Sequence, residues 1–422
     1  MIRIFWLLAG LIFSGSLFSQ TGASLPPWQE GFLDIHHIST GRGDAAYLVF
    51  PDGTTLVVDA GDISETHPRT LSPRNSTLKP DRSHTAPEWI ADYIRQFAPK
   101  GKPPVIDYAL ITHYHDDHFG EWDKTRKLSP KGGYALTGIM GVGEQIPIRT
   151  LLDRGYDFPI NLKDPIFAQN AESDEYHILQ TLREYWKFSD YHQANSGLIH
   201  EKLKPGSRSQ IVLKHQPEKW PEFYVRNISS NGQVWTGFED EQFISLFEPG
   251  QYPGENPLSN AIRITYGAFD YFTGGDLAGI NAIGEGDFNS LEANVAPVIG
   301  PVDVATLNHH GNRDSQSAFY VRTLRPRVWI GQTWSSDHPG DDVLRRITSK
   351  VIYPGERAVF STDMLESNEL VIGSRIENSY QSRHGHIVVR VAPGGETYQV
   401  FVLNDASAQR EVLATFGPYR SR

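Results

Sequence analysis

Regular patterning begins with three short apolar runs at 31–38, 44–50 and 54–61, separated by the turn-forming stretches STGRG and PDG. This pattern predicts three strands in a meander. Residues 86–98 carry apolar side chains at helical spacing and predict a helix, and the apolar run at 104–113 predicts a buried strand. Because strand, helix and strand alternate, the sequence favours a layered α/β core.

A long polar stretch interrupts this pattern. Residues 131–253 are punctuated and polar, with one helical piece near 173–188, and we expect an insertion or an elaborated wall rather than an independent domain. Regular patterning resumes at 260–276, which predicts two strands and a tight turn, and at 302–312, which predicts a strand ending in two histidines and a glycine. The tail at 386–404 predicts a hairpin across a Pro-Gly-Gly turn.

The N-terminus has the layout of a secretory signal. Arg3 precedes an apolar stretch from Ile4 to Phe13, and small or polar residues follow. This stretch is short for a bilayer span, although an uncleaved membrane anchor is the alternative. We predict a signal peptide over 1–23 and an exported protein, periplasmic or extracellular. No later segment reaches about 18 uninterrupted apolar residues, so no integral membrane span is expected after signal cleavage.

The composition narrows the chemistry. The 422 residues are 39% hydrophobic, enough for a substantial core, and the formal net charge of -11 argues against a protein whose whole surface binds nucleic acid. A local basic groove remains compatible with that charge. The chain has no cysteine, which excludes disulfides and thiolate nucleophiles. Any metal ion must therefore be held by His, Asp or Glu side chains.

The stretch ITHYHDDHFG contains the pattern H-x-H-x-D-H directly after the predicted strand at 104–113. A tight turn there can direct His113 and His115 at one cation while Asp117 and His118 face a second. Imidazole and carboxylate ligands suit zinc, manganese or iron. The alternative is that these histidines only hydrogen-bond a loop.

The chain resembles the metallo-β-lactamase superfamily, whose signature is this loop. It is most similar to the extracellular hydrolase domain of competence proteins of the DNA-uptake channel (ComEC) type. The resemblance rests on TGRGDAAYLVFPDGTTLVVDAGD, ITHYHDDHFG, NPLSNAIRITYGAFDYFTGGD, VDVATLNHHGN and SSDHP. It implies an α/β fold of the αββα sandwich type with a dinuclear metal site along one edge of the sheets. The implied organisation is a main hydrolase domain over 28–348, which carries the insertion, and a C-terminal β-rich extension over 349–422 packed on the same domain.

The resemblance also implies roles for individual residues. His113 and His115 would bind the first of two divalent ions, and Asp117 and His118 the second. Asp276 would bridge the ions. We expect zinc, with manganese as an alternative.

Two further roles follow from the same resemblance. His310 would complete the second site, with His309 as the second choice. Asp59 would support the loop without touching metal.

One departure concerns the first site. The superfamily supplies it with a third histidine, but the interval before Asp276 offers only His177, His192, His200 and His215, none in a recognisable context. The stretch ENPLSN stands where the competence-type branch carries an asparagine and serine motif. We predict a first site short of one protein ligand and filled by water. His338, in DHP, is a candidate general acid or oxyanion partner, and a plain loop residue is the alternative.

These observations predict an exported metal-dependent hydrolase that uses a metal-bound hydroxide, with Asp117 also orienting the nucleophile. The resemblance makes phosphodiesters or nucleic acid the leading substrate class. One alternative is hydrolysis of a carboxylic ester, lactone or β-lactam, because a fold does not fix a reaction. A second alternative is a non-catalytic metal-binding or scaffold protein.

Overall fold

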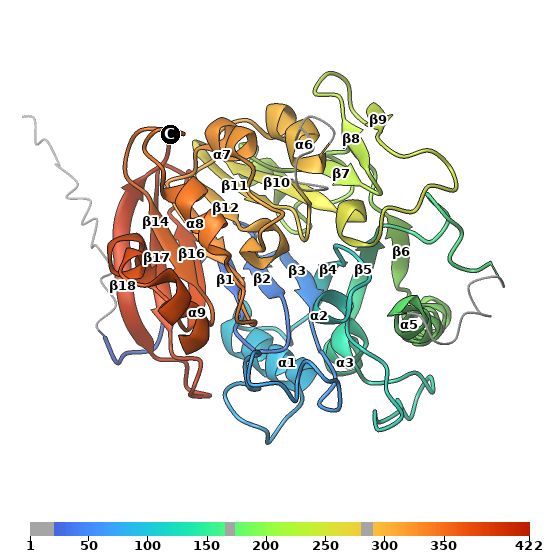
Figure 1. The fold of residues 1–422 in the computed structure, drawn as a ribbon. Coiled ribbons are helices and arrows are strands. Elements are labelled where there is room, and N and C mark those ends of the chain that lie inside the picture. Colours follow the sequence, from blue (N-terminus) through green and yellow to red (C-terminus); the bar gives the residue numbers. More distant parts are fainter. Residues whose placement is uncertain (1–20, 165–173, 280–289) are drawn as a thin grey trace, which may run out of the picture.

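The computed structural model describes residues 21–164, 174–279 and 290–422. Two nine-stranded sheets form its centre (Figure 1). The first sheet contains β1 (Leu33–His37), β2 (Ala45–Val49), β3 (Thr55–Ala60), β4 (Ile106–Leu110), β5 (Ile148–Asp153), β6 (Ile199–Lys202), β16 (His386–Val391), β17 (Thr397–Leu403) and β18 (Val412–Arg420). The second contains β7 (Phe223–Ser230), β8 (Gln233–Trp235), β9 (Phe243–Ser245), β10 (Ala261–Tyr266), β11 (Phe269–Thr273), β12 (Val304–Thr306), β13 (Val328–Gly331), β14 (Ala358–Ser361) and β15 (Tyr380–Ser382).

Each sheet changes from antiparallel to parallel pairing part of the way across. The order of the first sheet is β18-β17-β16-β1-β2-β3-β4-β5-β6, and its strands run parallel from β3 to β6. The order of the second is β15-β14-β13-β12-β11-β10-β7-β8-β9, and its strands run parallel from β11 to β15. Parallel neighbours end at the same edge of a sheet, so these regions gather the loops that follow them.

Helices cover the outer faces of both sheets. In Figure 1, α1 and α3 lie on one side of the paired sheets and α6 and α7 on the other. The helices are α1 (Ala86–Phe97), α2 (Asp116–Phe119), α3 (Gly138–Gln145), α5 (Asp174–Ser196), α6 (Leu291–Ile299), α7 (Ala318–Leu324), α8 (Asp341–Thr348), α9 (Glu366–Ile372) and α10 (Arg375–Ser379). This arrangement confirms the predicted αββα sandwich.

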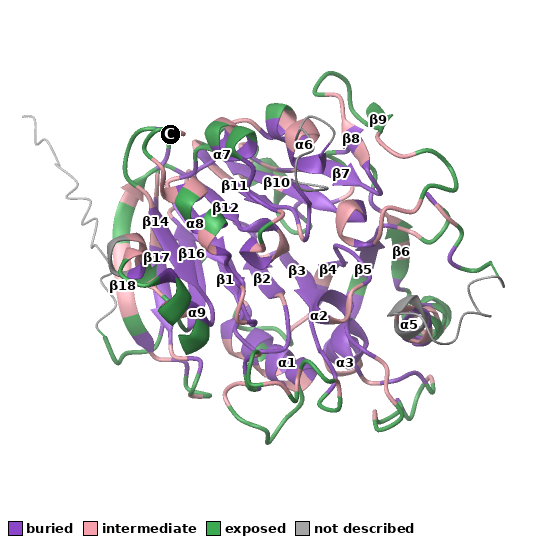
Figure 2. Ribbon diagram, in the orientation of Figure 1, coloured by how far each residue is buried: buried purple, intermediate pink, exposed green. Residues whose placement is uncertain are grey.

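Apolar residues form three layers of core, and Figure 2 shows the buried strands at the centre of the molecule. The middle layer lies between the sheets and includes Leu48, Ile264, Ile330 and Val389, all without exposed surface. The two outer layers pack the helices onto the sheets. Strands that are buried on both faces consist of continuous runs of apolar residues, so they could be predicted from the sequence.

Residues 131–253 differ from the expectation of a mostly irregular stretch. The helical piece is confirmed as part of α5, but β5 and β6 extend the first sheet and β7, β8 and β9 extend the second. Their pairing partners lie far away in the sequence, so the short runs gave no local strand signal. The domain boundaries stay predictions, and most of the signal peptide predicted for 1–23 lies outside the described residues.

The C-terminal residues confirm the predicted hairpin, because β16 and β17 pair antiparallel across the turn. β16 also pairs with β1 and so joins the end of the chain to its first strand. No helix within the described residues is long and apolar enough to cross a membrane.

The packing between the sheets yields a stability prediction. Ile264→Ala removes a fully buried side chain from the middle layer and should lower the free energy of unfolding by about 2–5 kcal/mol. Val351→Ala, at a side chain that is 96% exposed, should change it by less than about 0.5 kcal/mol. Urea unfolding followed by circular dichroism measures both values. Equal, small effects would contradict a close-packed interior between the sheets.

Candidate metal centre

The candidate residues lie where the parallel strands of both sheets end. In the first sheet, β3 carries Asp59 near its end and β4 is followed by His113. In the second sheet, β11 is followed by Asp276 and β12 by His310. The carboxyl ends of parallel strands are the usual place for ligand sites in layered α/β folds. The fold therefore brings residues from distant parts of the chain to one edge.

The H-x-H-x-D-H motif forms the loop after β4 and the short helix α2, for which His115 is the N-cap residue. This helix packs closely on the turn before β2 and on the end of β3. An added Cβ at Gly43 or Gly61 would lie 2.1 Å from the carbonyl oxygen of Asp117. The backbone N–H of Asp44 donates to that same oxygen at 2.8 Å. The glycines of TGRGD and VVDAG thus allow the metal-binding loop to sit against both strands.

Two groups of ligand atoms meet at Asp276. In the larger group, His310 Nε2 lies 2.9 Å from Asp117 Oδ2 and 3.5 Å from Asp276 Oδ2. His118 Nε2 lies 3.2 Å from Asp276 Oδ1. In the smaller group, His113 Nε2 lies 3.7 Å from Asp276 Oδ2 and 3.1 Å from His115 Nδ1. The structure therefore brings together all six predicted ligands, with Asp276 shared by both groups.

The donor atoms of the larger group fit a cation. His118 Nε2, His310 Nε2 and Asp276 Oδ1 are buried, and although they lie close to one another and to Asp117, none of them makes a hydrogen bond among the described residues. Buried polar atoms are nearly always satisfied, so these atoms call for a missing partner. Imidazole nitrogens and carboxylate oxygens that converge within 4.8 Å form a ligand set for a divalent ion such as zinc. The geometry thus supports metal binding by Asp117, His118, Asp276 and His310.

The pKa shifts within the cluster also favour metal binding. Burial alone lowers the pKa of His118, but the carboxylates of Asp276 and Asp117 raise it well above its usual range. Burial alone raises the pKa of Asp276, but His118 and His310 hold it well below its usual range. Burial and the neighbouring His118 keep the pKa of His113 well below normal. The buried carboxylates therefore require positive charge nearby. A metal ion can supply that charge in place of protons on the histidines.

Carboxylates outside the cluster orient its histidines. His118 Nδ1 lies 2.8 Å from Asp59 Oδ2, and Asp59 also accepts hydrogen bonds from the backbone N–H and hydroxyl of Thr112, both at 2.7 Å. His310 Nδ1 lies 2.9 Å from Asp44 Oδ1 and 3.0 Å from the carbonyl oxygen of Gln332. The position of Asp59 agrees with the predicted supporting role. Asp44 is a further supporting residue that the sequence analysis did not identify, and its only signal was the glycine-rich turn around it.

The NHHG turn holds its histidines in an uncommon backbone conformation. His309 and His310 have φ values of 48° and 55°, in the left-handed region that non-glycine residues rarely adopt. The preceding Asn308 donates its side-chain amide to Glu292 at 2.8 Å, and Glu292 also accepts the backbone N–H of Gln316 at 2.7 Å. Burial raises the pKa of Glu292 to about 7. This buried network fixes the turn, and nothing in the local sequence marked Glu292.

The two histidines of that turn point to different partners. His310 reaches the larger ligand group, as preferred from the sequence. His309 Nδ1 lies 2.8 Å from Asp314 Oδ1, and its Nε2 lies 3.1 Å from the amide nitrogen of Asn256. His309 Nε2 is also 3.8 Å from Asp276 Oδ2. His309 therefore lies at the rim of the cluster.

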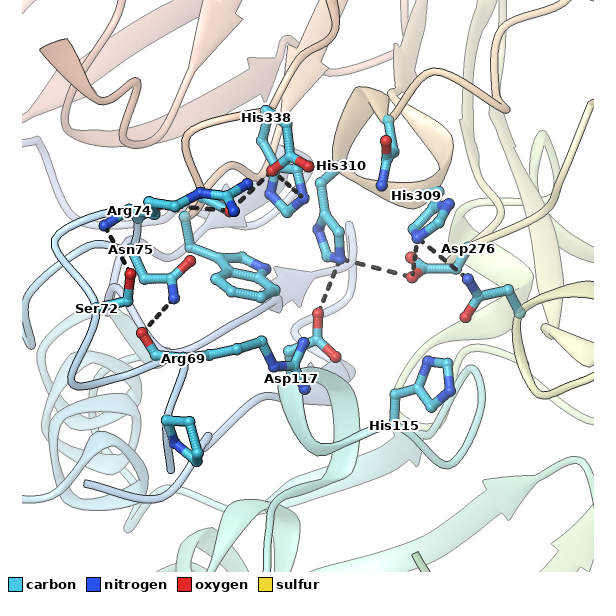
Figure 3. Close-up of a pocket in the computed structure, with 16 residues that line it drawn as sticks. Arg69, Ser72, Arg74, Asn75, His115, Asp117, Asp276, His309, His310 and His338 are labelled. Carbon is cyan, nitrogen blue, oxygen red and sulfur yellow. Dashed lines mark hydrogen bonds and ion pairs between the residues drawn. The ribbon is translucent and has the colours of Figure 1, made fainter. Parts of the chain in front are cut away.

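A cavity of about 480 Å³ opens onto the ligand groups (Figure 3). His338 lines it and stacks on His310, with ring centroids 4.6 Å apart and an interplanar angle of 21°. Its Nδ1 has no partner among the described residues. Burial and the nearby His310 hold the pKa of His338 well below its usual range. His338 thus faces the cavity as a neutral imidazole.

Three of the four candidates for a third histidine at the first site lie elsewhere. His192 contacts the hydroxyl of Tyr134 at 2.9 Å, and His200 contacts Asp153 at 2.7 Å. His215 lines a separate cavity, and the side chain of His177 lies outside the described residues.

The ENPLSN stretch lies beside the first site. Ser259 Oγ lies 3.3 Å from His113 Nδ1 and accepts the backbone N–H of Asp276 at 3.1 Å. Ser259 thus orients a histidine of the first site and the shared carboxylate.

No protein-family model matches the sequence, and no curated protein matches it. Similar solved structures include a variant of CmlA β-hydroxylase, with a TM-score of 0.34 and 12% identity over 87% of this chain and 55% of that chain. Zn²⁺-bound PqqB from Methylobacterium extorquens has a TM-score of 0.32 and 11% identity over 85% of this chain and 99% of that chain. The hydrolase AbOPH of the beta lactamase superfamily has a TM-score of 0.33 and 14% identity over 62% of this chain and 76% of that chain. This chain spans little more than half of the hydroxylase, and similarity at these scores identifies no family.

The supporting role of Asp59 is testable by metal binding. Asp59→Ala should weaken zinc affinity by about 10–100-fold, because His118 loses the partner that fixes its ring. Asp157→Ala, at a carboxylate whose side chain is 66% exposed, is the matched control and should leave affinity unchanged. Competition titration of the metal-free proteins against a zinc chelator measures both. Unchanged affinity in the Asp59 variant would contradict the supporting role of Asp59.

Proposed function

We propose that this protein is a metal-dependent hydrolase that cleaves phosphodiesters. The observation that carries the proposal is the buried set of ligand atoms around Asp276, which make no hydrogen bond among the described residues and lie beside an open cavity. In this assignment Asp117, His118, Asp276 and His310 hold one divalent ion, and His113, His115 and Asp276 hold a second. Zinc suits these ligands, and manganese is the alternative.

The metal ions would supply Lewis acidity that activates water and polarises the substrate oxygen. The chain contributes the rest of the chemistry. Asp117 reaches the cavity as well as the larger ligand group, so its carboxylate can also orient the attacking water. His338 lines the same cavity, its Nδ1 makes no hydrogen bond among the described residues and its Nε2 lies 3.8 Å from Asp337 Oδ1, and we assign it to binding a substrate oxygen.

The cavity wall favours an anionic substrate. The loop after β3 carries Arg69 and Arg74 into the wall. Arg74 donates to the hydroxyl of Ser336, and its positive charge also helps to lower the pKa of Asp337 in the same cavity. An uncommitted guanidinium beside a metal cluster suits phosphate oxygens, which it can bind in a bidentate manner. The phosphodiester class also rests on the resemblance to competence-type domains, from which nucleic acid follows as one substrate.

We also propose that the protein is exported, on the strength of the signal-like N-terminus. Expression of the full chain in a bacterial host, followed by fractionation and N-terminal sequencing, tests this. A mature protein in the periplasm or medium, cleaved between residues 16 and 24, is the expected result. Retention of the uncleaved chain in the cytoplasm would contradict export.

The catalytic proposal predicts hydrolysis of bis-p-nitrophenyl phosphate by the metal-loaded protein. Asp117→Asn should lower kcat/KM by more than about a hundredfold, since it removes a proposed ligand that also faces the cavity. Asp157→Asn is the surface control. Thermal unfolding of the metal-free proteins checks that the Asp117 variant is folded. Full activity in that variant would contradict the assigned site, and bound metal without any phosphodiester hydrolysis would direct the search to carboxylic esters and lactones.

A further inference from the structure

A second cavity of about 450 Å³ adjoins the first one beside the metal cluster. Both cavities are lined by Arg69 and His115, so the two side chains stand at the junction. The metal ligand His115 therefore faces both spaces. A substrate whose reacting bond lies at the metal cluster can extend one arm into each cavity.

The second cavity has a different lining from the first. Phe119 and Ile178 are its apolar lining residues, and Asp116, Glu121 and His67 are among its polar ones. His67 Nε2 lies 3.9 Å from Glu121 Oε1. Arg69 also borders it, but its Nη2 donates to both carboxylate oxygens of Asp116, at 2.8 and 2.6 Å. The charge of Arg69 is thus already matched. The second cavity offers no uncommitted guanidinium to an anion.

Glu121 makes the second cavity still less favourable for an anion. It is buried, and its Oε2 accepts the backbone N–H of Ser64 at 2.7 Å. Burial and the nearby Asp116 raise its pKa to about 7. In its ionised form, this carboxylate repels a phosphate that enters the second cavity.

The first cavity differs from the second because its lining includes a guanidinium that can bind an anion. Arg74 and Asn75 line it on the side away from His115, as Figure 3 shows, and Asn312 also lines it. Asp337 is a carboxylate in the same cavity, but its side chain is 40% exposed and it accepts the Ser335 hydroxyl at 2.8 Å. Arg74 keeps N–H groups for a substrate anion.

We infer that the preferred substrate is an asymmetric phosphodiester, with a further anionic group on the arm that enters the first cavity and an uncharged arm in the second. This inference rests on the proposed function. Such a bond is found at the end of a nucleic acid strand, where one side continues as a polyanion and the other is a terminal nucleoside. Water adds across the P–O bond, and the products are one alcohol and one phosphate monoester.

Four thymidine dinucleotides test the inference: TpT, the singly phosphorylated pTpT and TpTp, and the doubly phosphorylated pTpTp. One of the two singly phosphorylated compounds should have a kcat/KM roughly three- to tenfold above both TpT and pTpTp. Arg74→Gln should remove most of this preference. Glu121→Gln should raise kcat/KM for pTpTp relative to the wild type, because it removes the carboxylate from the second cavity.

Arg149→Gln is the matched control, since Arg149 is exposed near the start of β5, at the opposite end of the strands from the site. It should leave the ratios unchanged. Equal kcat/KM for all four compounds, or pTpTp as the best substrate, would overturn the inference while the proposed function stands. Failure to cleave bis-p-nitrophenyl phosphate as well as every dinucleotide would overturn both.

Discussion

The carboxylate of Asp276 is the point at which the two sheets depend on each other. It follows a strand of the second sheet, yet it faces His113 and His118 from the first sheet and His310 from its own. In a buried site, carboxylates and imidazoles at these distances are stable only with shared positive charge. The edges of the two sheets must therefore stay in register with each other, and the dense middle layer of core fixes that register.

The surroundings of the cluster restrict its side chains further. Asp59 and Asp44 each bind the Nδ1 side of one histidine and leave the Nε2 side directed at the cluster. Glu292 holds the turn that keeps His310 in a left-handed backbone conformation. Strain of this kind persists only where surrounding contacts enforce it. The same rigid arrangement places His115 between the two cavities. It therefore supports both the proposed chemistry and the proposed difference in charge preference between the cavities.

Much of this arrangement could be predicted from the sequence. Continuous apolar runs marked the buried strands, and the dense H-x-H-x-D-H loop marked the cluster, with Asp276 and His310 added through family resemblance. The strands within 131–253 were missed because their stability comes from distant neighbours. Asp44 and Glu292 were missed for a similar reason: a carboxylate becomes a supporting residue only through the fold that places it beside a histidine or its turn. The sequence analysis predicted a first site short of one protein ligand, and that Ser259 lies beside His113 could be learned only from the structure.

We propose that the buried ligand atoms around Asp276 hold a divalent cation. Crystals grown with zinc and measured on both sides of the zinc absorption edge test this proposal. We expect an anomalous peak within bonding distance of His118 Nε2, His310 Nε2 and Asp276. Ordered side chains with no peak there, and direct hydrogen bonds between the histidines and carboxylates instead, would contradict it.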